Sequence, residues 1–149
     1  MRRSIVWITL AGALVSAGIA VVRLGHPAPA KAQAVCTLST MQGTYGYHLQ
    51  GWFVDNPSVA PVPVAQIGSV LADGSGNMKV ATTMSQGGQI VKAGFNFTYQ
   101  INPDCSGSMT PVAGSDAGPA EFMLTDGGKQ MMLIVTQAGS VMSGTGMRQ

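Results

Sequence analysis

The stretch QIVKAGFNFTYQINPDCSGSM, residues 89–109, decides the fold of this chain. Its residues 95–101 alternate between large apolar and polar side chains, which is the period of a half-buried β-strand. The apolar residues, which would share one face, are Phe95, Phe97, Tyr99 and Ile101. Asn102-Pro103-Asp104 then predicts a turn, because proline fixes φ and Asn and Asp side chains bond their own backbone. We therefore expect a long strand, a tight corner and a cysteine, Cys105, directly after it.

The alternation of apolar and polar side chains recurs along the rest of the chain after residue 34. Clusters of Gly, Asn, Asp and Ser separate the alternating segments, and Asp126-Gly127 is a strong hairpin signal. No segment there has a convincing 3.6-residue period, and only residues 38–41 could form a single helical turn. We expect eight strands, over residues 43–54, 64–71, 78–84, 89–101, 105–112, 120–125, 130–136 and 141–147.

Short links between consecutive strands favour antiparallel pairing in sequence order. Eight such strands can close into an up-and-down β-barrel, which removes exposed sheet edges. A barrel of this size is just wide enough for its interior to be filled by side chains or to hold one small ligand. The alternative is a β-sandwich, which needs Greek-key crossovers, and the chain has few connections long enough to make them. The sequence thus predicts an all-β, eight-stranded antiparallel barrel.

Residues 1–34 have the composition of a secretory signal peptide. A basic start, Met1-Arg2-Arg3, precedes an uncharged apolar run over residues 4–22, and Ala32-Gln33-Ala34 fits an A-x-A cleavage signature. We expect cleavage after Ala34, which would leave a single secreted or periplasmic domain over residues 35–149. The alternative is an N-terminal membrane anchor, since the apolar run is almost long enough to span a bilayer. The protein would then contact a membrane only through this segment.

The positive charge of the chain belongs to the predicted leader. The full chain has a formal net charge of +2, whereas residues 35–149 carry four basic and six acidic side chains, a formal charge of −2. The four basic residues are Lys79, Lys92, Lys129 and Arg148. A few scattered basic side chains make no patch that could follow a phosphate backbone. We therefore expect no nucleic-acid partner.

Cys36 and Cys105 are the only cysteines, and both follow the predicted cleavage site. An exported protein meets an oxidising compartment, and two cysteines allow a single pairing. We expect a Cys36–Cys105 disulfide, with two free thiols of a cytosolic protein as the alternative. Closing a loop of about 70 residues would restrict the unfolded chain by roughly 4 kcal/mol in the loop-entropy account.

Four segments in a fixed order carry a resemblance to a known group of barrels. They are GTYGYHLQG from residue 43, ADGSGN from residue 72, FTYQINPDCSGSM from residue 97 and DGGKQMMLIVTQAGSVMSGTGMRQ from residue 126. With these, the chain resembles small secreted bacterial β-barrel proteins of the calycin type, that is, lipocalin-like and allene oxide cyclase-like barrels. The resemblance covers nearly all of residues 35–149 and implies an antiparallel barrel with a partly apolar interior. It transfers no catalytic residue.

Few residues after position 34 could carry acid–base or metal chemistry. His48 is the only histidine there, and no metal-binding, P-loop or nucleophile-elbow motif occurs, so we expect no metal ion and no cofactor. His48 and Glu121 are the catalytic candidates, because little else titrates near neutral pH. The alternation favours a solvent-facing position for both. In the opposite register they would lie inside the barrel and could act on a ligand there.

The apolar residues of several strands would meet on the enclosed side of a barrel. We expect the following residues to line that interior and to bind a ligand: Tyr47, Leu49, Phe95, Phe97, Tyr99, Leu133 and Val135. Nine methionines after residue 34 would suit a plastic apolar pocket, with ordinary core filling as the alternative. Residues 131–135, MMLIV, are apolar on both faces, so we expect a neighbouring subunit or the N-terminal segment to cover their outer face.

Three classes of function remain open after these observations. The favoured hypothesis is an exported barrel that binds a small apolar ligand in its lumen. The alternatives are a cyclase or isomerase of the allene oxide cyclase-like type, and a structural or surface assembly unit that forms homo-oligomers. An open apolar lumen without a buried acid or base favours binding, a lumen that holds His48 or Glu121 favours an enzyme, and a lumen packed shut favours the structural unit.

Overall fold

The computed structural model of the chain describes residues 35–54 and 58–149. The predicted signal peptide over residues 1–34, its alternative as a membrane anchor and the cleavage site after Ala34 lie outside the described residues. The described part is a β-barrel with two single-turn 3-10 helices, η1 (Leu38–Thr40) and η2 (Asp126–Gly128). The single turn expected over residues 38–41 is therefore present as η1.

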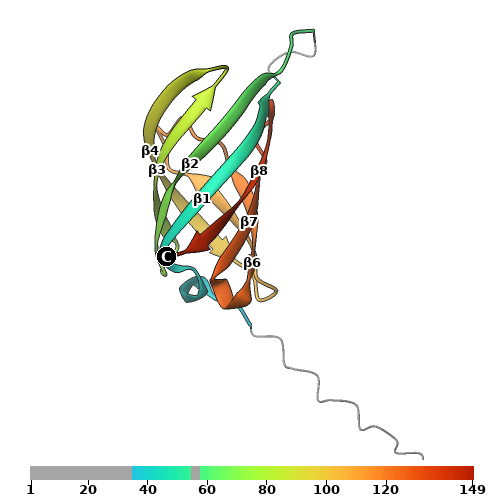
Figure 1. The fold of residues 1–149 in the computed structure, drawn as a ribbon. Coiled ribbons are helices and arrows are strands. Elements are labelled where there is room, and N and C mark those ends of the chain that lie inside the picture. The colour runs from blue at the N-terminus through green and yellow to red at the C-terminus, as the bar shows by residue number, and fades with distance from the viewer. Residues whose placement is uncertain (1–34, 55–57) are drawn as a thin grey trace, which may run out of the picture. The chain divides into compact units, whose positions relative to one another are not determined.

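Eight strands follow one another around the barrel in the order of the sequence, and each is antiparallel to the next (Figure 1). β8 also pairs with β1, from Tyr45 opposite Arg148 to Phe53 opposite Ser140, so the sheet closes. The predicted eight-stranded antiparallel up-and-down barrel is confirmed, and the β-sandwich alternative is wrong. The strands are β1 (Gln42–Phe53), β2 (Val62–Asp73), β3 (Asn77–Gln86), β4 (Gln89–Ile101), β5 (Ser106–Pro111), β6 (Ala120–Thr125), β7 (Gln130–Val135) and β8 (Ser140–Arg148).

The alternation in the sequence sets which side chains point inward. On β4, Phe97 and Tyr99 are buried, whereas Asn96, Thr98 and Gln100, which alternate with them, are exposed. Successive side chains of a strand point to opposite faces of the sheet, and a barrel encloses only one face. Similar alternation on β1, β6 and β7 brings apolar side chains to the same interior. The outer face is mostly polar on β1, whereas on β7 it carries the exposed Met132 and Ile134.

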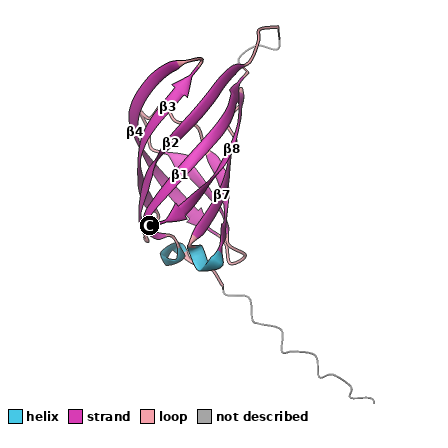
Figure 2. Ribbon diagram, viewed as in Figure 1, coloured by secondary structure: helices cyan, strands magenta, loops and turns pink. Residues whose placement is uncertain are grey.

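The two ends of the barrel differ, since antiparallel strands place alternate connections at opposite ends. The closed end carries η1, η2, the C-terminus and the turns that follow β2, β4 and β6 (Figure 2). The open end carries the connections that follow β1, β3, β5 and β7. The N-terminal segment around η1 therefore lies where it can cover the closed end.

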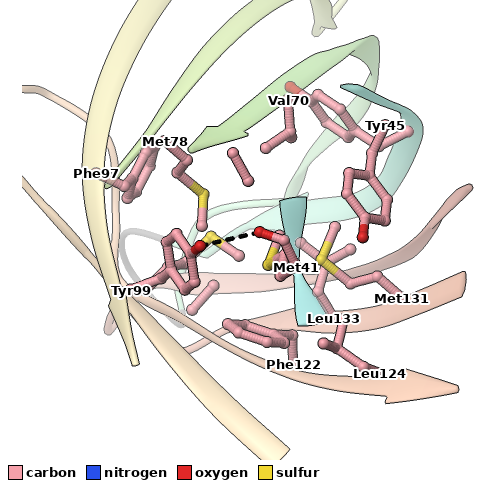
Figure 3. Close-up of a cluster of buried hydrophobic side chains, with 14 of the residues drawn as sticks. Met41, Tyr45, Val70, Met78, Phe97, Tyr99, Phe122, Leu124, Met131 and Leu133 are labelled. Atoms are coloured by element: carbon pink, nitrogen blue, oxygen red, sulfur yellow. Dashed lines mark hydrogen bonds between the residues drawn. The ribbon is translucent and has the colours of Figure 1, made fainter. Parts of the chain in front are cut away.

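A floor made of Met41, Tyr45, Met78 and Tyr99 fills the closed end of the barrel. Met41, which follows η1, has no exposed surface, and Tyr45 and Met78 are also fully buried. The Tyr99 hydroxyl donates to the backbone oxygen of Met41 at 2.9 Å (Figure 3) and lies 3.2 Å from that of Leu38. The backbone of the N-terminal segment is thus held by a side chain from the closed-end part of β4.

Arg148, near the end of β8, joins the first and last parts of the domain at the closed end. Its Nη2 donates to the Thr40 carbonyl oxygen at 2.6 Å and to the Tyr45 hydroxyl oxygen at 2.8 Å. The guanidinium carbon lies 5.3 Å from the centre of the Tyr45 ring, within the range of a cation–π contact. Tyr45 in turn donates its hydroxyl proton to the Gly128 carbonyl oxygen in η2 at 2.6 Å. Charge-assisted hydrogen bonds of this kind stabilise the closure of the floor.

The expected disulfide between Cys36 and Cys105 is present. The two Cα atoms are 5.0 Å apart, and the bridge closes a sequence separation of 69 residues. The Cys36 amide also donates to the Pro103 carbonyl oxygen at 3.2 Å, so the segment before η1 is attached twice to the corner after β4. Cys105 itself has a φ of 71°, a left-handed conformation that is uncommon outside glycine.

Candidate functional site

Between the floor and the open end, the barrel encloses a cavity of about 220 Å³. Every strand contributes to its wall, and two connections at the open end complete it. Most of the wall is apolar, as expected for side chains that alternate inward from a barrel. The lining residues are Tyr47, Leu49, Phe53, Gln66, Val70, Val80, Thr82, Met84, Phe95, Phe97, Met109, Asp116, Ala117, Gly118, Ala120, Met131, Leu133, Val135, Gln137 and Met142.

Most of the residues that were predicted from the sequence to bind a ligand lie on this wall. The ones that line the cavity are Tyr47, Leu49, Phe95, Phe97, Leu133 and Val135. Tyr99 also points inward, but it lies lower in the barrel, where its hydroxyl binds the backbone of the floor. The structure therefore brings six of the seven together around one space. Ligand binding by any of them stays a prediction.

The two catalytic candidates lie outside the lumen. His48 is exposed between the inward-facing Tyr47 and Leu49, and its Nδ1 is 3.5 Å from the Thr145 hydroxyl on the outer surface. Glu121 is exposed between the buried Ala120 and Phe122. Both positions agree with the solvent-facing register expected from the alternation. Neither side chain can contact a molecule in the cavity.

A polar cluster of three side chains interrupts the apolar wall: Tyr47 on β1, Gln66 on β2 and Thr82 on β3. The Tyr47 hydroxyl donates to Gln66 Oε1 at 3.3 Å, and the Thr82 hydroxyl donates to the same oxygen at 3.1 Å. The Thr82 hydroxyl oxygen also lies 3.2 Å from the Ile67 carbonyl oxygen. Burial raises the pKa of the Tyr47 phenol, and a hydrogen bond with Thr82 opposes that shift. The phenol therefore stays protonated at neutral pH.

A glycine on the neighbouring strand makes room for the Tyr47 ring on the wall. Gly68 on β2 and Gly146 on β8 are the residues that face Tyr47 across the sheet on either side. A Cβ atom at Gly68 would lie 2.9 Å from Cε1 of the Tyr47 ring and would also collide with the Ala81 carbonyl oxygen. A Cβ atom at Gly146 would lie 3.0 Å from the Met131 methyl group. Glycine at position 68 thus allows the Tyr47 ring to approach β2 closely.

Gln66 and Thr82 were missed by the sequence reasoning, although a signal for them exists. Gln66 is two residues from Val64 and four from Val70, which are both buried, so a period of two places it inward. Thr82 on β3 is four residues from the buried Met78, so the same period places it inward. Apolar character alone therefore does not identify every residue of the lining, because polar residues also occupy inward positions.

The open end of the cavity carries the only acidic side chain among the lining residues. Asp116 belongs to the connection between β5 and β6, and Gln137 lies in the connection between β7 and β8. No Lys, Arg or His is among the lining residues. A molecule in the cavity would therefore meet apolar groups, a neutral polar cluster and one carboxylate at the rim.

The described residues offer no other evident chemistry. Among residues 35–54 and 58–149, no group of three or more His, Cys, Asp or Glu side chains could hold a metal ion. Within the same part of the chain, no helix has the length and apolar character needed to cross a membrane. On the outside of β7, Met132 and Ile134 are exposed, as expected for a strand that is apolar on both faces. Cover of this face by a neighbouring subunit or by the N-terminal segment stays a prediction.

The architecture that the chain adopts agrees with the resemblance to calycin-type barrels. Its strands form a closed antiparallel barrel in consecutive order, with the apolar side chains directed inward. Such a barrel is consistent with a calycin-like fold, although the fold alone does not assign an activity. Comparison of the chain with family models, with curated proteins and with solved structures found no match.

Proposed function

We propose that the barrel binds one small, largely apolar molecule in its lumen. The observation that supports this proposal is the cavity of about 220 Å³, which has an apolar wall, a packed floor and an open end. Apolar cavities of about 150 Å³ hold benzene, and pockets for drug-sized ligands begin at roughly 300 Å³. The ligand that fills the described space is therefore on the order of ten non-hydrogen atoms, intermediate between those two cases.

The same geometry bears on the alternative functions. A cyclase or isomerase would need an acid or base against its substrate, and both His48 and Glu121 lie on the outer surface. The titratable side chains that do line the cavity are Tyr47, which stays protonated, and Asp116 at the rim. A purely structural barrel of this size would be expected to fill its interior with side chains. The part of this barrel between the floor and the open end instead encloses a cavity.

Binding can be tested with 1-naphthylamine, an uncharged probe close to the size of the proposed ligand whose emission shifts to shorter wavelength in apolar surroundings. We expect saturable binding of one probe per chain. The matched variants are Val135→Trp, which adds bulk to the cavity wall, and Ile134→Trp, which adds the same bulk to the outer surface. Val135→Trp should weaken binding at least tenfold, and Ile134→Trp should leave it unchanged.

Thermal unfolding of both variants serves as the control for folding. The proposal predicts that Val135→Trp loses the probe while it still unfolds cooperatively. Binding that is lost equally in Ile134→Trp, or that survives in a folded Val135→Trp, would place the probe outside the lumen and contradict the proposal. Absence of any binding to the unmodified protein would contradict it directly.

We also propose that the protein is exported, with a mature chain that begins at Val35. The support is the disulfide, because such bridges persist in oxidising compartments, together with the leader-like composition of residues 1–34. Intact-mass measurement of protein recovered from the periplasm or medium of a bacterial expression host tests this. The mass should correspond to residues 35–149 with one disulfide, and a membrane-bound chain that retains residues 1–34 would contradict cleavage.

A further inference from the structure

The polar cluster on the lumen wall leaves one hydrogen-bond donor without a protein partner. Gln66 Oε1 accepts hydrogen bonds from both Tyr47 and Thr82, which fixes the orientation of the amide. The other end of that amide, Nε2, has no hydrogen-bond partner among residues 35–54 and 58–149. Because no enclosed side-chain polar atom in this part of the chain is unsatisfied, Nε2 must be accessible from the cavity that Gln66 lines.

The position of Gln66 along the barrel adds a second constraint. Gln66 lies opposite Leu49 on β1 and Met84 on β3, about midway along β2. Apolar side chains line the cavity on both sides of it, with Phe53 toward the open end and Val70 toward the floor. A ligand that reaches Nε2 would therefore present its acceptor between two apolar parts, rather than at a charged end that remains in water.

The charges around the cavity exclude an anionic acceptor. A carboxylate at the depth of Gln66 would lose its hydration, and no cationic side chain lines the cavity to compensate for that loss. The Asp116 carboxylate at the rim would also repel an entering anion. Moving a neutral carbonyl oxygen from water into the apolar cavity costs less free energy, and this oxygen can accept the hydrogen bond that the Gln66 amide offers.

We propose that the ligand is an uncharged ketone or ester whose carbonyl oxygen accepts a hydrogen bond from Gln66 Nε2, with apolar groups on both sides of the carbonyl. This inference rests on the proposed binding function and names the chemical class that the same lumen takes. Tyr47 and Thr82 act as positioning residues, since they hold Oε1 and thereby direct Nε2 toward the ligand. Substitution of either residue is expected to weaken the binding of a ketone more than the binding of a hydrocarbon of the same size.

The experiment uses three compounds of matched size: propiophenone, n-propylbenzene and 3-phenylpropanoate. Each competes with 1-naphthylamine for the unmodified protein and for Gln66→Met, which keeps a linear side chain and removes the amide. Gln50→Met, at an exposed position on β1, is the matched control. In Gln66→Met, the ratio of the ketone to the hydrocarbon dissociation constant should rise about tenfold, as for a lost hydrogen bond. In Gln50→Met the ratio should not change, and 3-phenylpropanoate should be the weakest competitor throughout.

The outcomes separate this inference from the proposed function. A probe that binds, together with an unchanged ratio in Gln66→Met or with 3-phenylpropanoate competing as well as the ketone, would overturn the inference and leave lumen binding intact. A probe that does not bind would overturn lumen binding and this inference with it. If Gln66→Met does not fold, the infrared spectrum of bound propiophenone decides. Its carbonyl stretch should lie below the frequency found in an alkane solvent, and an alkane-like frequency would overturn the inference.

Discussion

Truncation of Met41 to alanine tests whether the floor is as well packed as the structure indicates. Met41 has no exposed surface and lies among Tyr45, Met78 and Tyr99 at the closed end (Figure 3). Met41→Ala removes the side chain beyond Cβ but keeps the backbone oxygen that accepts the Tyr99 hydrogen bond. The change therefore isolates side-chain packing from hydrogen bonding.

The expected loss follows from the burial of this side chain. Replacing a fully buried methionine by alanine lowers the free energy of unfolding by about 2–5 kcal/mol, through lost transfer free energy and the cavity left behind. For a domain of this size about 4 °C of melting temperature corresponds to 1 kcal/mol, so the melting temperature should fall by roughly 8–20 °C. Tyr99 remains bonded to the backbone, so the barrel should still unfold in a single cooperative transition.

Urea denaturation of residues 35–149, with the disulfide intact, measures this loss. Met132→Ala is the matched control, since Met132 on the outside of β7 is 51% exposed. The control should change the free energy of unfolding by no more than about 0.5 kcal/mol. If Met41→Ala were as stable as Met132→Ala, the closed end would not be held by packing around Met41, and the reasoning about the floor would be refuted.

Two further predictions concern the bridge and the titrating side chains. Cys36→Ser combined with Cys105→Ser should lower the free energy of unfolding by roughly 4 kcal/mol, because the bridge closes a long loop in the unfolded chain; a loss below about 1 kcal/mol would contradict this account. Burial raises the pKa of Tyr47 and Tyr99 above the ordinary value of 10.0. The contribution of the two protonated phenols to the free energy of unfolding is therefore fully present below pH 10, and it is lost as the pH rises through their pKa values in the folded state. The melting temperature should therefore fall above pH 10, and less steeply in Tyr47→Phe; a melting temperature independent of pH in that range would contradict it.

The strands could be predicted from the sequence because each follows one local rule. β4 and β6 have the expected bounds, since clear alternation ends at strong turn residues. β2 begins at Val62, earlier than expected, because Pro63 fits near the end of a strand although it donates no hydrogen bond. β5 begins at Ser106, after the expected start at Cys105, because the φ of 71° at Cys105 is far from the extended values of a strand.

The site could be predicted only in part, because alternation gives the face of a residue but not its height in the barrel. Phe97 and Tyr99 share a face, yet Phe97 lines the cavity and Tyr99 belongs to the floor. Height depends on the stagger between neighbouring strands, which long-range pairing sets. The place of Met41 in the floor likewise depends on where the disulfide and Arg148 fix the N-terminal segment, and no local sequence pattern encodes that position.

The methionines provide the most direct measurement of the central claim, that a small apolar molecule binds inside the barrel. Met84, Met109, Met131 and Met142 line the cavity, whereas Met123, Met132 and Met147 are exposed on the outside. With ¹³C-labelled methionine methyl groups, an aromatic probe shifts the resonances of the methyls it contacts. Addition of 1-naphthylamine should shift the four lumen methyls and leave the three outer methyls unchanged. Shifts confined to Met123, Met132 and Met147 would contradict the account.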